Sequence, residues 1–300
     1  YKLPPQAVVD IIDTPSAPGV SFSPNREWML LVDRDAMPDI EDVSRRMLAL
    51  AGMRIDPTSN GPFQTSFNRG ITLVKRDNLV KNNNSSIRIK LSDDVKISRI
   101  NWSHNSKYFS FAVVTDQGQQ LWVAAVDDPT PRLLTNRLNT IMAGPRWLPN
   151  GKQMLCLLVP ENHGDEPAPA KVTVGPNIQE SYGQTSPTRT YQDLLQNAHD
   201  EALFEYYTTT QLSLVGVDGS VQPIGSPTMY TSMSPSPSGD FVLTTNLKKP
   251  FSYLMTYRSF PRDITVQKIN PAASGPNSYV VASIPMDEHI PIEGVRTGPR

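Results

Sequence analysis

Four segments of this chain share a pattern that limits the folds the chain can adopt. In each segment an apolar or aromatic stretch leads into a turn rich in Ser, Pro, Asn and Gly, and an apolar run follows the turn. The segments begin at Val20, Ile100, Pro145 and Met233. The turn position is occupied by Asn25, Asn105, Asn150 and Ser238. Asn and Gly at such a tip are expected to supply the positive φ angle of a tight hairpin, so each segment predicts a hairpin between the first two strands of a repeated unit.

The spacing of the repeat predicts the size of each unit. Phe22, Trp102, Trp147 and Pro235 hold the same position in the four segments, at steps of 80, 45 and 88 residues. The middle step matches a β-propeller blade of about 40–45 residues. We interpret the longer steps as single blades with insertions, because only two further strands follow each insertion.

Alternating and apolar runs supply the third and fourth strands of each unit. These runs are 71–75 and 87–91, 121–126 and 132–134, 211–217 and 221–224, and 264–269 and 279–284. Four strands in each of four units are typical of a propeller. We therefore predict an all-β fold, a partial β-propeller domain over 1–300, with four-stranded blades at approximately 19–92, 95–135, 140–226 and 228–285 and the start of a further blade at 286–300.

The first insertion contains a predicted helix. The stretch 38–52 begins with Asp39, which can cap a helix, and closes with Gly52, which can end one. Between them apolar residues recur on one helical face. We therefore expect a helix over 39–50.

The second insertion combines a loop with another predicted helix. Residues 160–187 are rich in proline and show little periodicity. A helix is predicted near 191–204, where Thr190 and Asp193 approximate a capping box and apolar residues form a stripe. Both insertions lie between the second and third strands of their blades. Because successive connections alternate faces, we expect both helices on the same face of the disc.

Composition fits a turn-rich all-β protein and excludes several functions. The chain has 28 prolines, is 38% apolar and 19% charged, and carries a formal charge of −1 with acidic and basic residues interspersed. The basic residues form no continuous stripe that could bind phosphates, so we expect no nucleic-acid binding. The longest apolar runs, 28–32 and 154–159, are far shorter than the about 20 residues of a membrane span. Cys156, the only cysteine, predicts a buried and inert thiol. The opening on Tyr1, without a methionine, indicates a processed or partial chain.

No complete catalytic centre is expected within this chain. A nucleophile elbow requires Gly-x-Ser-x-Gly, and the sequence contains no such pentapeptide. The histidines at 104, 163, 199 and 289 each fit a solvated turn or helix surface. A Ser-His-Asp site does not require neighbours in sequence, so a site built from distant residues stays open at this level.

Two short runs, 163–166 and 199–201, combine a histidine with acidic residues. Neither matches His-Glu-x-x-His or a calcium loop, and acid-rich loops are commonly just solvated. We therefore expect no metal site. No Gly-rich phosphate loop follows a strand, and no cofactor is expected.

Three residues are candidates for binding a peptide substrate. Glu201 and Glu205 are four positions apart on a helix, where two acids on one face can hold a cationic amino terminus; the alternative is a solvated helix face. Arg189 precedes the helix and can receive a substrate carboxylate through a bidentate pair; the alternative is a surface arginine.

Several longer strings along the chain are distinctive. They are Tyr-Lys-Leu-Pro-Pro-Gln at the start, Val-Asp-Ile-Ile-Asp-Thr-Pro at 9–15, Leu-Ala-Gly-Met-Arg-Ile-Asp-Pro at 50–57, Arg-Thr-Tyr-Gln-Asp-Leu-Leu at 189–195, the stretch 200–212, Lys-Pro-Phe-Ser-Tyr at 249–253 and Val-Arg-Thr-Gly-Pro-Arg at 295–300. Together they resemble the glutamyl endopeptidases of the prolyl oligopeptidase family, over essentially the whole chain.

The resemblance implies a serine peptidase with an N-terminal propeller and a C-terminal α/β-hydrolase domain that carries a Ser-Asp-His triad. Plant members are plastid enzymes that cut after glutamate, and bacterial members are often exported, so the implied compartment is the plastid in a plant and the periplasm or exterior in a bacterium. The sequence stops at Arg300, so the hydrolase domain is absent from this chain and no catalytic residue is carried over to it.

These observations favour the N-terminal propeller part of a serine-type endopeptidase. It would guide a peptide or protein substrate to a triad located elsewhere, with the preference for glutamate implied by the resemblance, and this chain alone would not be catalytic. The alternative is a non-catalytic propeller scaffold that binds proteins; a third hypothesis is a complete small enzyme that acts through a histidine. Four blades are not expected to close a ring, so the remainder of the polypeptide or a second chain would complete the propeller.

Overall fold

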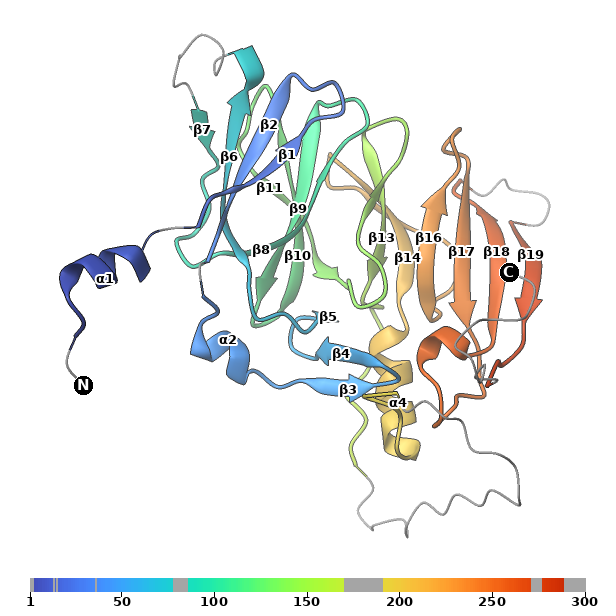
Figure 1. Cartoon of the computed structure of the whole chain (residues 1–300). Coiled ribbons are helices and arrows are strands. Elements are labelled where there is room, and N and C mark those ends of the chain that lie inside the picture. The colour runs from blue at the N-terminus through green and yellow to red at the C-terminus, as the bar shows by residue number, and fades with distance from the viewer. Residues whose placement is uncertain are drawn as a thin grey trace, which may run out of the picture.

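Antiparallel strands are the main secondary structure of the computed structural model, which describes residues 3–12, 14, 16–35, 37–77, 86–169, 191–270 and 277–288 (Figure 1). All of the described strands except β3, β4 and β5 fall into four groups of four. The first group contains β1 (Gly19–Phe22), β2 (Trp28–Arg34), β6 (Asn68–Lys75) and β7 (Ser86–Arg88). The second contains β8 (Lys96–Trp102), β9 (Tyr108–Thr115), β10 (Gly118–Ala125) and β11 (Arg132–Leu138). The third contains β12 (Arg146–Trp147), β13 (Gln153–Leu158), β14 (Gln211–Gly216) and β15 (Val221–Pro223), and the fourth β16 (Tyr230–Pro235), β17 (Phe241–Leu247), β18 (Arg262–Lys268) and β19 (Ser278–Ile284).

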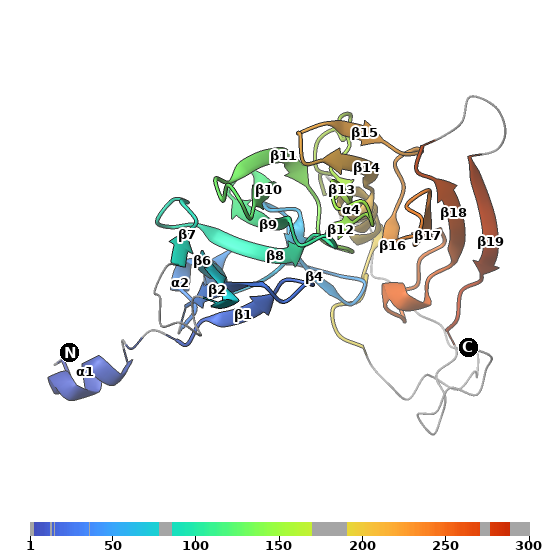
Figure 2. The same ribbon diagram turned by 90° about the horizontal axis from the view of Figure 1, so that it is seen from above.

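Each strand pairs with the next strand of its own group, in antiparallel order. Single residue pairs, Asn68 with Ile97 and Leu138 with Leu158, join the first three groups into one continuous hydrogen-bonded sheet, while the fourth group is a separate sheet. Figure 2 shows the groups side by side in an arc. The first strand of each group lies on the inner side of the arc and the last strand on the outer side.

The four repeated turns have one geometry, which corrects the expected role of the asparagines. The positive φ angles belong to the following residues, Arg26, Ser106, Gly151 and Gly239. The Asn side chains and Ser238 instead accept a hydrogen bond from the backbone N–H two residues later, at 2.9–3.3 Å. A short polar side chain that closes the turn in this way orients the backbone, and the next residue then takes the left-handed conformation.

The groups pack face to face in chain order. One buried cluster joins the first and second groups, another the second and third, and another the third and fourth. Leu73 and Phe111 belong to the first of these clusters, Val123 and Cys156 to the second, and Leu155 and Val242 to the third. Each fully buried aliphatic or aromatic side chain contributes about 1.5–3 kcal/mol relative to an exposed one, so these interfaces hold the arc together.

The first insertion is a short helix followed by a small sheet, and the prediction of one helix over 39–50 is wrong. Asp39 caps the helix α2 (Ile40–Ser44), as predicted, by accepting a hydrogen bond from the Glu41 N–H at 3.1 Å. The chain then forms β3 (Leu48–Leu50), β4 (Met53–Asp56) and β5 (Gly61–Pro62). Ala51 and Gly52 both have positive φ, at 51° and 81°, which is the geometry of a two-residue hairpin turn rather than of a helix end.

Tertiary contacts explain why this segment forms a hairpin. The Gly52 N–H donates to the carbonyl of Asp193 at 2.7 Å, and the Ala51 carbonyl accepts from the Tyr257 N–H at 2.9 Å. Leu50 and Ile55 are buried in a cluster with residues of the second insertion and of the fourth group. Both partners are distant in sequence, so local periodicity could not predict the hairpin.

The second insertion ends in α4 (Ala198–Thr208), which begins later than predicted. Asn197 is its cap and accepts a hydrogen bond from the Asp200 N–H at 2.9 Å. Thr190 lies outside the described residues, and Asp193 has a φ of 60° and pairs with Arg54 at 2.9 Å instead of capping a helix. Phe204 of α4 is fully buried against two phenylalanines of the fourth group.

Two further helical elements complete the described part of the chain. They are the exposed helix α1 (Gln6–Ile12), which the sequence did not predict, and the 3-10 turn η1 (Tyr257–Ser259). Figure 1 shows both insertions at the same end of the strands, as predicted. Among the helices described, none is long and apolar enough to cross a membrane.

Candidate functional site

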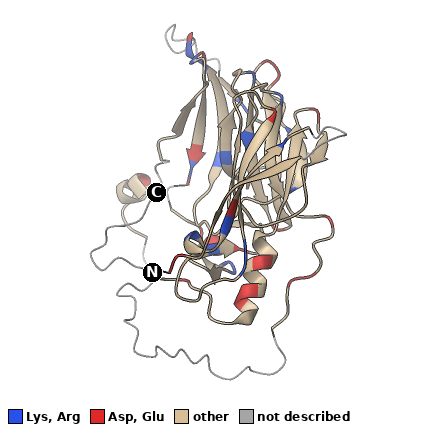
Figure 3. Ribbon diagram, turned by 90° about the vertical axis from the view of Figure 1, so that its right-hand side faces the viewer, with Lys and Arg blue, Asp and Glu red and all other residues tan. Residues whose placement is uncertain are grey.

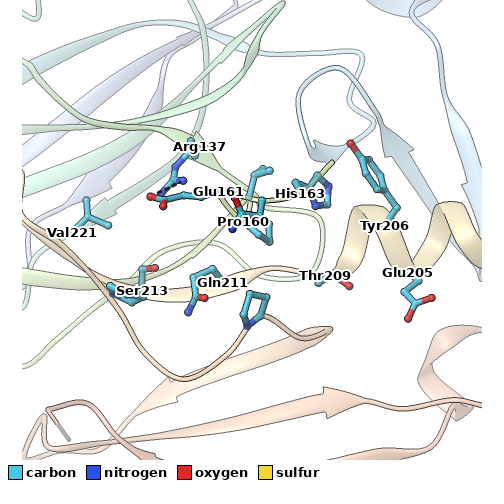
Figure 4. Close-up of a pocket in the computed structure, with 14 residues that line it drawn as sticks. Arg137, Pro160, Glu161, His163, Glu205, Tyr206, Thr209, Gln211, Ser213 and Val221 are labelled. Carbon is cyan, nitrogen blue, oxygen red and sulfur yellow. Dashed lines mark ion pairs between the residues drawn. The ribbon is translucent and has the colours of Figure 1, made fainter. Parts of the chain in front are cut away.

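A cavity of about 640 Å³ opens between the second and third groups, beside the end of α4 (Figure 4). Its walls come from β11, from the segment that follows β13, and from β14 and β15. The last turn of α4 closes the end near the insertions. The cavity therefore lies at the junction between the strand framework and the second insertion.

Aromatic stacking shapes the wall beside α4. Pro160 follows β13, and the chain then places the His163 ring on the Tyr206 ring, with centroids 3.9 Å apart. The Tyr206 hydroxyl donates to the carbonyl of Gly164 at 3.1 Å. Burial lowers the pKa of His163 below its ordinary value, so its ring is neutral at neutral pH.

Polar groups of the strands line the opposite wall. Ser213 is 1% exposed and its hydroxyl has no hydrogen-bond partner in the described part of the chain; Figure 4 shows this hydroxyl directed into the cavity. The Gln211 amide donates to the carbonyls of Leu212, Ile224 and Gly225 at 2.8–3.2 Å, which leaves its oxygen to accept. Arg137 pairs at 3.1 Å with Glu161, a highly exposed partner. These groups can hydrogen-bond to a polar ligand such as a peptide backbone.

The cavity lacks the contacts of a nucleophilic centre. A catalytic serine needs a base within about 2.6–3.2 Å, and no described histidine is hydrogen-bonded to a serine. The only hydrogen bond recorded for a described histidine joins the His104 Nδ1 to the carbonyl of Leu148 at 3.3 Å. His289 lies outside the described residues. Cys156 is fully buried, as predicted, and burial raises the pKa of its thiol, which favours the unreactive form.

The predicted acidic pair on α4 contacts the fourth group. Figure 3 shows the acidic positions of α4 as red bands on the helix. Glu205 lines the cavity and pairs with the Lys249 Nζ at 2.6 Å. Glu201 accepts a hydrogen bond from the Tyr253 hydroxyl at 2.6 Å, and this bond raises the pKa of Tyr253 to about 12. Both carboxylates therefore join α4 to one segment, and their role in substrate binding stays a prediction. Arg189 lies outside the described residues, so its role also stays a prediction.

Glu166 links the two insertions and could not be identified from sequence. It accepts hydrogen bonds from both Arg46 terminal nitrogens, at 3.0 and 2.5 Å, and from the Tyr207 hydroxyl at 2.8 Å. The hydrogen bond from Arg46 lowers the pKa of Glu166, and burial together with Glu166 raises the pKa of Tyr207. Arg46 and Glu166 are 120 residues apart, and no local pattern predicts their contact.

The runs 163–166 and 199–201 use their acidic residues for contacts within the chain. Glu166 is held by Arg46, Asp200 accepts from the Gln196 N–H at 2.8 Å, and Glu201 is held by Tyr253. Across the described ranges, no group of three or more His, Cys, Asp or Glu side chains could hold a metal ion.

The described part of the chain is an all-β scaffold with a cavity and two insertions at one end. Two sequence relatives show what the chain is similar to. The chain is 33% identical over 315 residues to a probable chloroplastic glutamyl endopeptidase of Oryza sativa subsp. japonica, and 32% identical to its counterpart in Arabidopsis thaliana. Both matches cover 100% of this chain and about a third of the relative, at 33% and 32% of its length.

The chain is homologous to glutamyl endopeptidases over its full length, which confirms the resemblance of its longer strings. No family model matches it. Among solved structures, an acylaminoacyl peptidase of Pyrococcus horikoshii aligns with 91% of this chain and 33% of its own, at 10% identity and a TM-score of 0.48. The β-propeller domain of the trilobed protease from Pyrococcus furiosus aligns with 90% of this chain and 58% of its own, at 9% identity and a TM-score of 0.44. The similarity to glutamyl endopeptidases rests on the two sequence relatives alone.

Proposed function

We propose that this chain is the propeller part of a serine-type endopeptidase and guides peptide substrates to a Ser-Asp-His site outside this sequence. The observation that carries the proposal is the homology to glutamyl endopeptidases along the whole chain, which spans about a third of the length of those relatives. In this proposal the four groups of strands are four successive blades. The proposal includes a preference for cleavage after glutamate, which rests on the names of the two relatives, probable glutamyl endopeptidases.

The exposed flank of the fourth group supports the presence of further blades. Val242 packs toward the third group, so its neighbours Phe241 and Leu243 face the other way. Leu243 pairs with Val266, which pairs with Tyr279, and Leu243 and Tyr279 are 45% and 51% exposed. None of the buried clusters of described residues joins strands of the first and fourth groups. We propose that another sheet of the same kind, from the remainder of the protein or a second chain, covers this flank.

The insertions support a role in admitting substrate. Both lie at one end of the strands, where Glu166 and the β3–β4 hairpin join them to each other and to the fourth group. In this proposal that end faces the peptidase domain. Loops carried by a rigid framework are the usual position for binding residues, and a closed entrance would keep water and large proteins from the reaction site.

Peptide cleavage tests the proposal directly. The protein from the complete reading frame should hydrolyse an internally quenched peptide that contains glutamate, and residues 1–300 alone should show no turnover. The matched control is the same peptide with glutamine in place of glutamate. Steady turnover by residues 1–300 that disappears in Ser213→Ala would place the catalytic serine inside this chain and overturn the proposal.

A non-catalytic scaffold is the second candidate. It is favoured by the cavity, which contains a buried serine hydroxyl without a base in hydrogen-bond contact. The coding sequence that follows Arg300 separates the two candidates. A downstream Gly-x-Ser-x-Gly supports the peptidase, and its absence from the complete reading frame supports the scaffold.

A further inference from the structure

Two arginines on the inner side of the arc have no acidic partner among the described residues. Arg99 lies on β8 and Arg146 on β12, the first strands of neighbouring groups (Figure 2). Among the described residues, the Arg99 guanidinium forms one weak hydrogen bond, to the carbonyl of Thr140 at 3.4 Å. Within the part of the chain that the structure describes, neither arginine takes part in an ion pair, although many exposed arginines there do.

The two positive charges act on each other. Arg99 is accessible to solvent, yet desolvation by the surrounding protein, and then the charge of Arg146, lower the pKa of Arg99. Like charges on neighbouring strands repel each other until an anion binds between them.

The backbone of β8 is also adapted to place Arg99. The strand register shifts between Ser98 and Asn101, and Arg99 has a φ of 52°, a conformation that a bulky residue rarely adopts. The Asn101 amide stabilises this bulge by donating to the Arg99 carbonyl at 3.1 Å. A Cβ atom on Gly144 would lie 3.2 Å from the Arg99 Cδ, so the glycine leaves room for the arginine side chain.

The positive φ of Arg99 and the repulsion between Arg99 and Arg146 do not themselves stabilise the fold. Unusual backbone conformations of this kind concentrate at ligand sites, where a bound group compensates for them. Each guanidinium offers a planar fork of N–H donors that matches the two oxygens of a carboxylate. We propose that Arg99 and Arg146 form a carboxylate-binding site for acidic peptides on the inner side of the arc.

This inference rests on the proposed function, because a peptide reaches the inner strands only if the protein admits peptides. The carboxylate has two sources in a peptide, an acidic side chain and the free C-terminus. Equilibrium binding separates these two sources, with three fluorescent peptides that differ only at one residue and at the C-terminus. The first has an internal glutamate and an amidated C-terminus, the second glutamine in place of glutamate, and the third glutamine with a free C-terminus.

Fluorescence anisotropy measures the binding to the protein from the complete reading frame, treated with a serine-directed phosphonate so that peptides are not consumed. We expect the glutamate peptide to bind about 10- to 100-fold more tightly than the glutamine peptide, the ratio for hydrogen bonds to a charged group. Arg99→Gln and Arg146→Gln should each remove this preference and leave the affinity for the glutamine peptide unchanged. If the third peptide shows the preference and the first does not, the site binds the C-terminal carboxylate.

Arg76→Gln is the matched control, because the Arg76 side chain is exposed and, among the described residues, its guanidinium contacts only Asp77, at 3.5 Å. It should retain the preference. Arg99→Gly should bind like Arg99→Gln and melt at the same or a higher temperature, because glycine accepts the positive φ; a purely structural arginine would instead lose stability. Arg146→Lys keeps the charge and should recover only part of the affinity.

Two results would overturn the inference. One is equal affinity of the phosphonate-treated protein without substitutions for all three peptides; the other is an unchanged glutamate preference in both Gln variants. Either result leaves the proposed function standing if the protein still cleaves peptides. A protein that neither binds nor cleaves any of the peptides would overturn the proposed function and this site together.

Discussion

Asp42 joins the first insertion to two groups of strands, and its charge should be required for stability. Its side chain is 1% exposed and accepts a hydrogen bond from the Lys96 Nζ at 2.6 Å and from Arg69 at 3.3 Å. The Arg45 Nε lies 3.6 Å from the same carboxylate. Three cations therefore surround one buried carboxylate: Arg45 at the end of α2, Arg69 on β6 and Lys96 on β8.

The substitution Asp42→Asn keeps the shape of the side chain and removes its charge. At an effective dielectric constant of about 20, each cation within 3–4 Å attracts the carboxylate by about 4–5 kcal/mol, and desolvation offsets most of this. Removing one partner of a buried ion pair costs about 3–5 kcal/mol. The side chains of the three cations are about one-fifth exposed, at 19%, 23% and 22%, so water compensates in part and we expect about 3 kcal/mol.

Urea unfolding measures this cost, with Asp39→Asn as the control. Asp39 undergoes the same chemical change at the start of the same helix, but it is exposed, and among the described residues its carboxylate accepts only the Glu41 N–H. Asparagine is also a good helix cap, so the control should change the free energy of unfolding by less than about 1 kcal/mol. Equal costs for the two variants would refute the assignment of Asp42 as the centre of the ion-pair network.

Three further predictions concern the second insertion. Phe204→Ala should lower the free energy of unfolding by about 3–5 kcal/mol because it empties a fully buried aromatic site; Phe204→Leu should cost clearly less, and equal costs in urea unfolding would contradict the packing. Glu201→Gln should lower the pKa of Tyr253 from about 12 toward its ordinary value, as followed by phenolate absorbance in an alkaline titration; an unchanged titration would exclude the hydrogen bond as the cause. His163 has a lowered pKa, so the unfolded chain binds more protons than the folded one as the pH falls below about 6.5, and stability should fall with it. The difference in melting temperature between pH 7 and pH 5 should therefore be smaller in His163→Phe than in the original protein, and equal differences would contradict the prediction.

The repeated hairpins were predictable because their structure depends on a few neighbouring residues. A side chain such as Asn105 accepts a backbone hydrogen bond two residues later, and the apolar run that follows alternates across a strand. The first strands of the groups, the approximate limits of the third and fourth strands, and the position of both insertions follow from such local patterns. Glycine takes the positive φ at Gly151 and Gly239, as predicted, whereas in the other two turns Arg26 and Ser106 take it in place of the asparagine, because the Asn side chain closes the turn.

Local patterns failed where distant segments supply the partners. The apolar residues of 39–50 fit one face of a helix, yet Leu50 is buried beneath α4 and the hairpin turn at Ala51 and Gly52 is held by backbone partners more than 100 residues away. Local propensity is a weak preference, and burial against a distant surface outweighs it.

The candidate sites show the same division. The sequence by itself determined the turn chemistry, the strand alternation and the resemblance to glutamyl endopeptidases, since these depend on short strings of residues. Only the tertiary structure decided that Ser213 faces a cavity with His163, that Arg46 reaches Glu166, and that Arg99 and Arg146, on the first strands of neighbouring groups, have no acidic partner among the described residues. The physical reason is that a charge or a hydroxyl gains its properties from what surrounds it in space, and folding brings together residues that the order of the chain keeps apart.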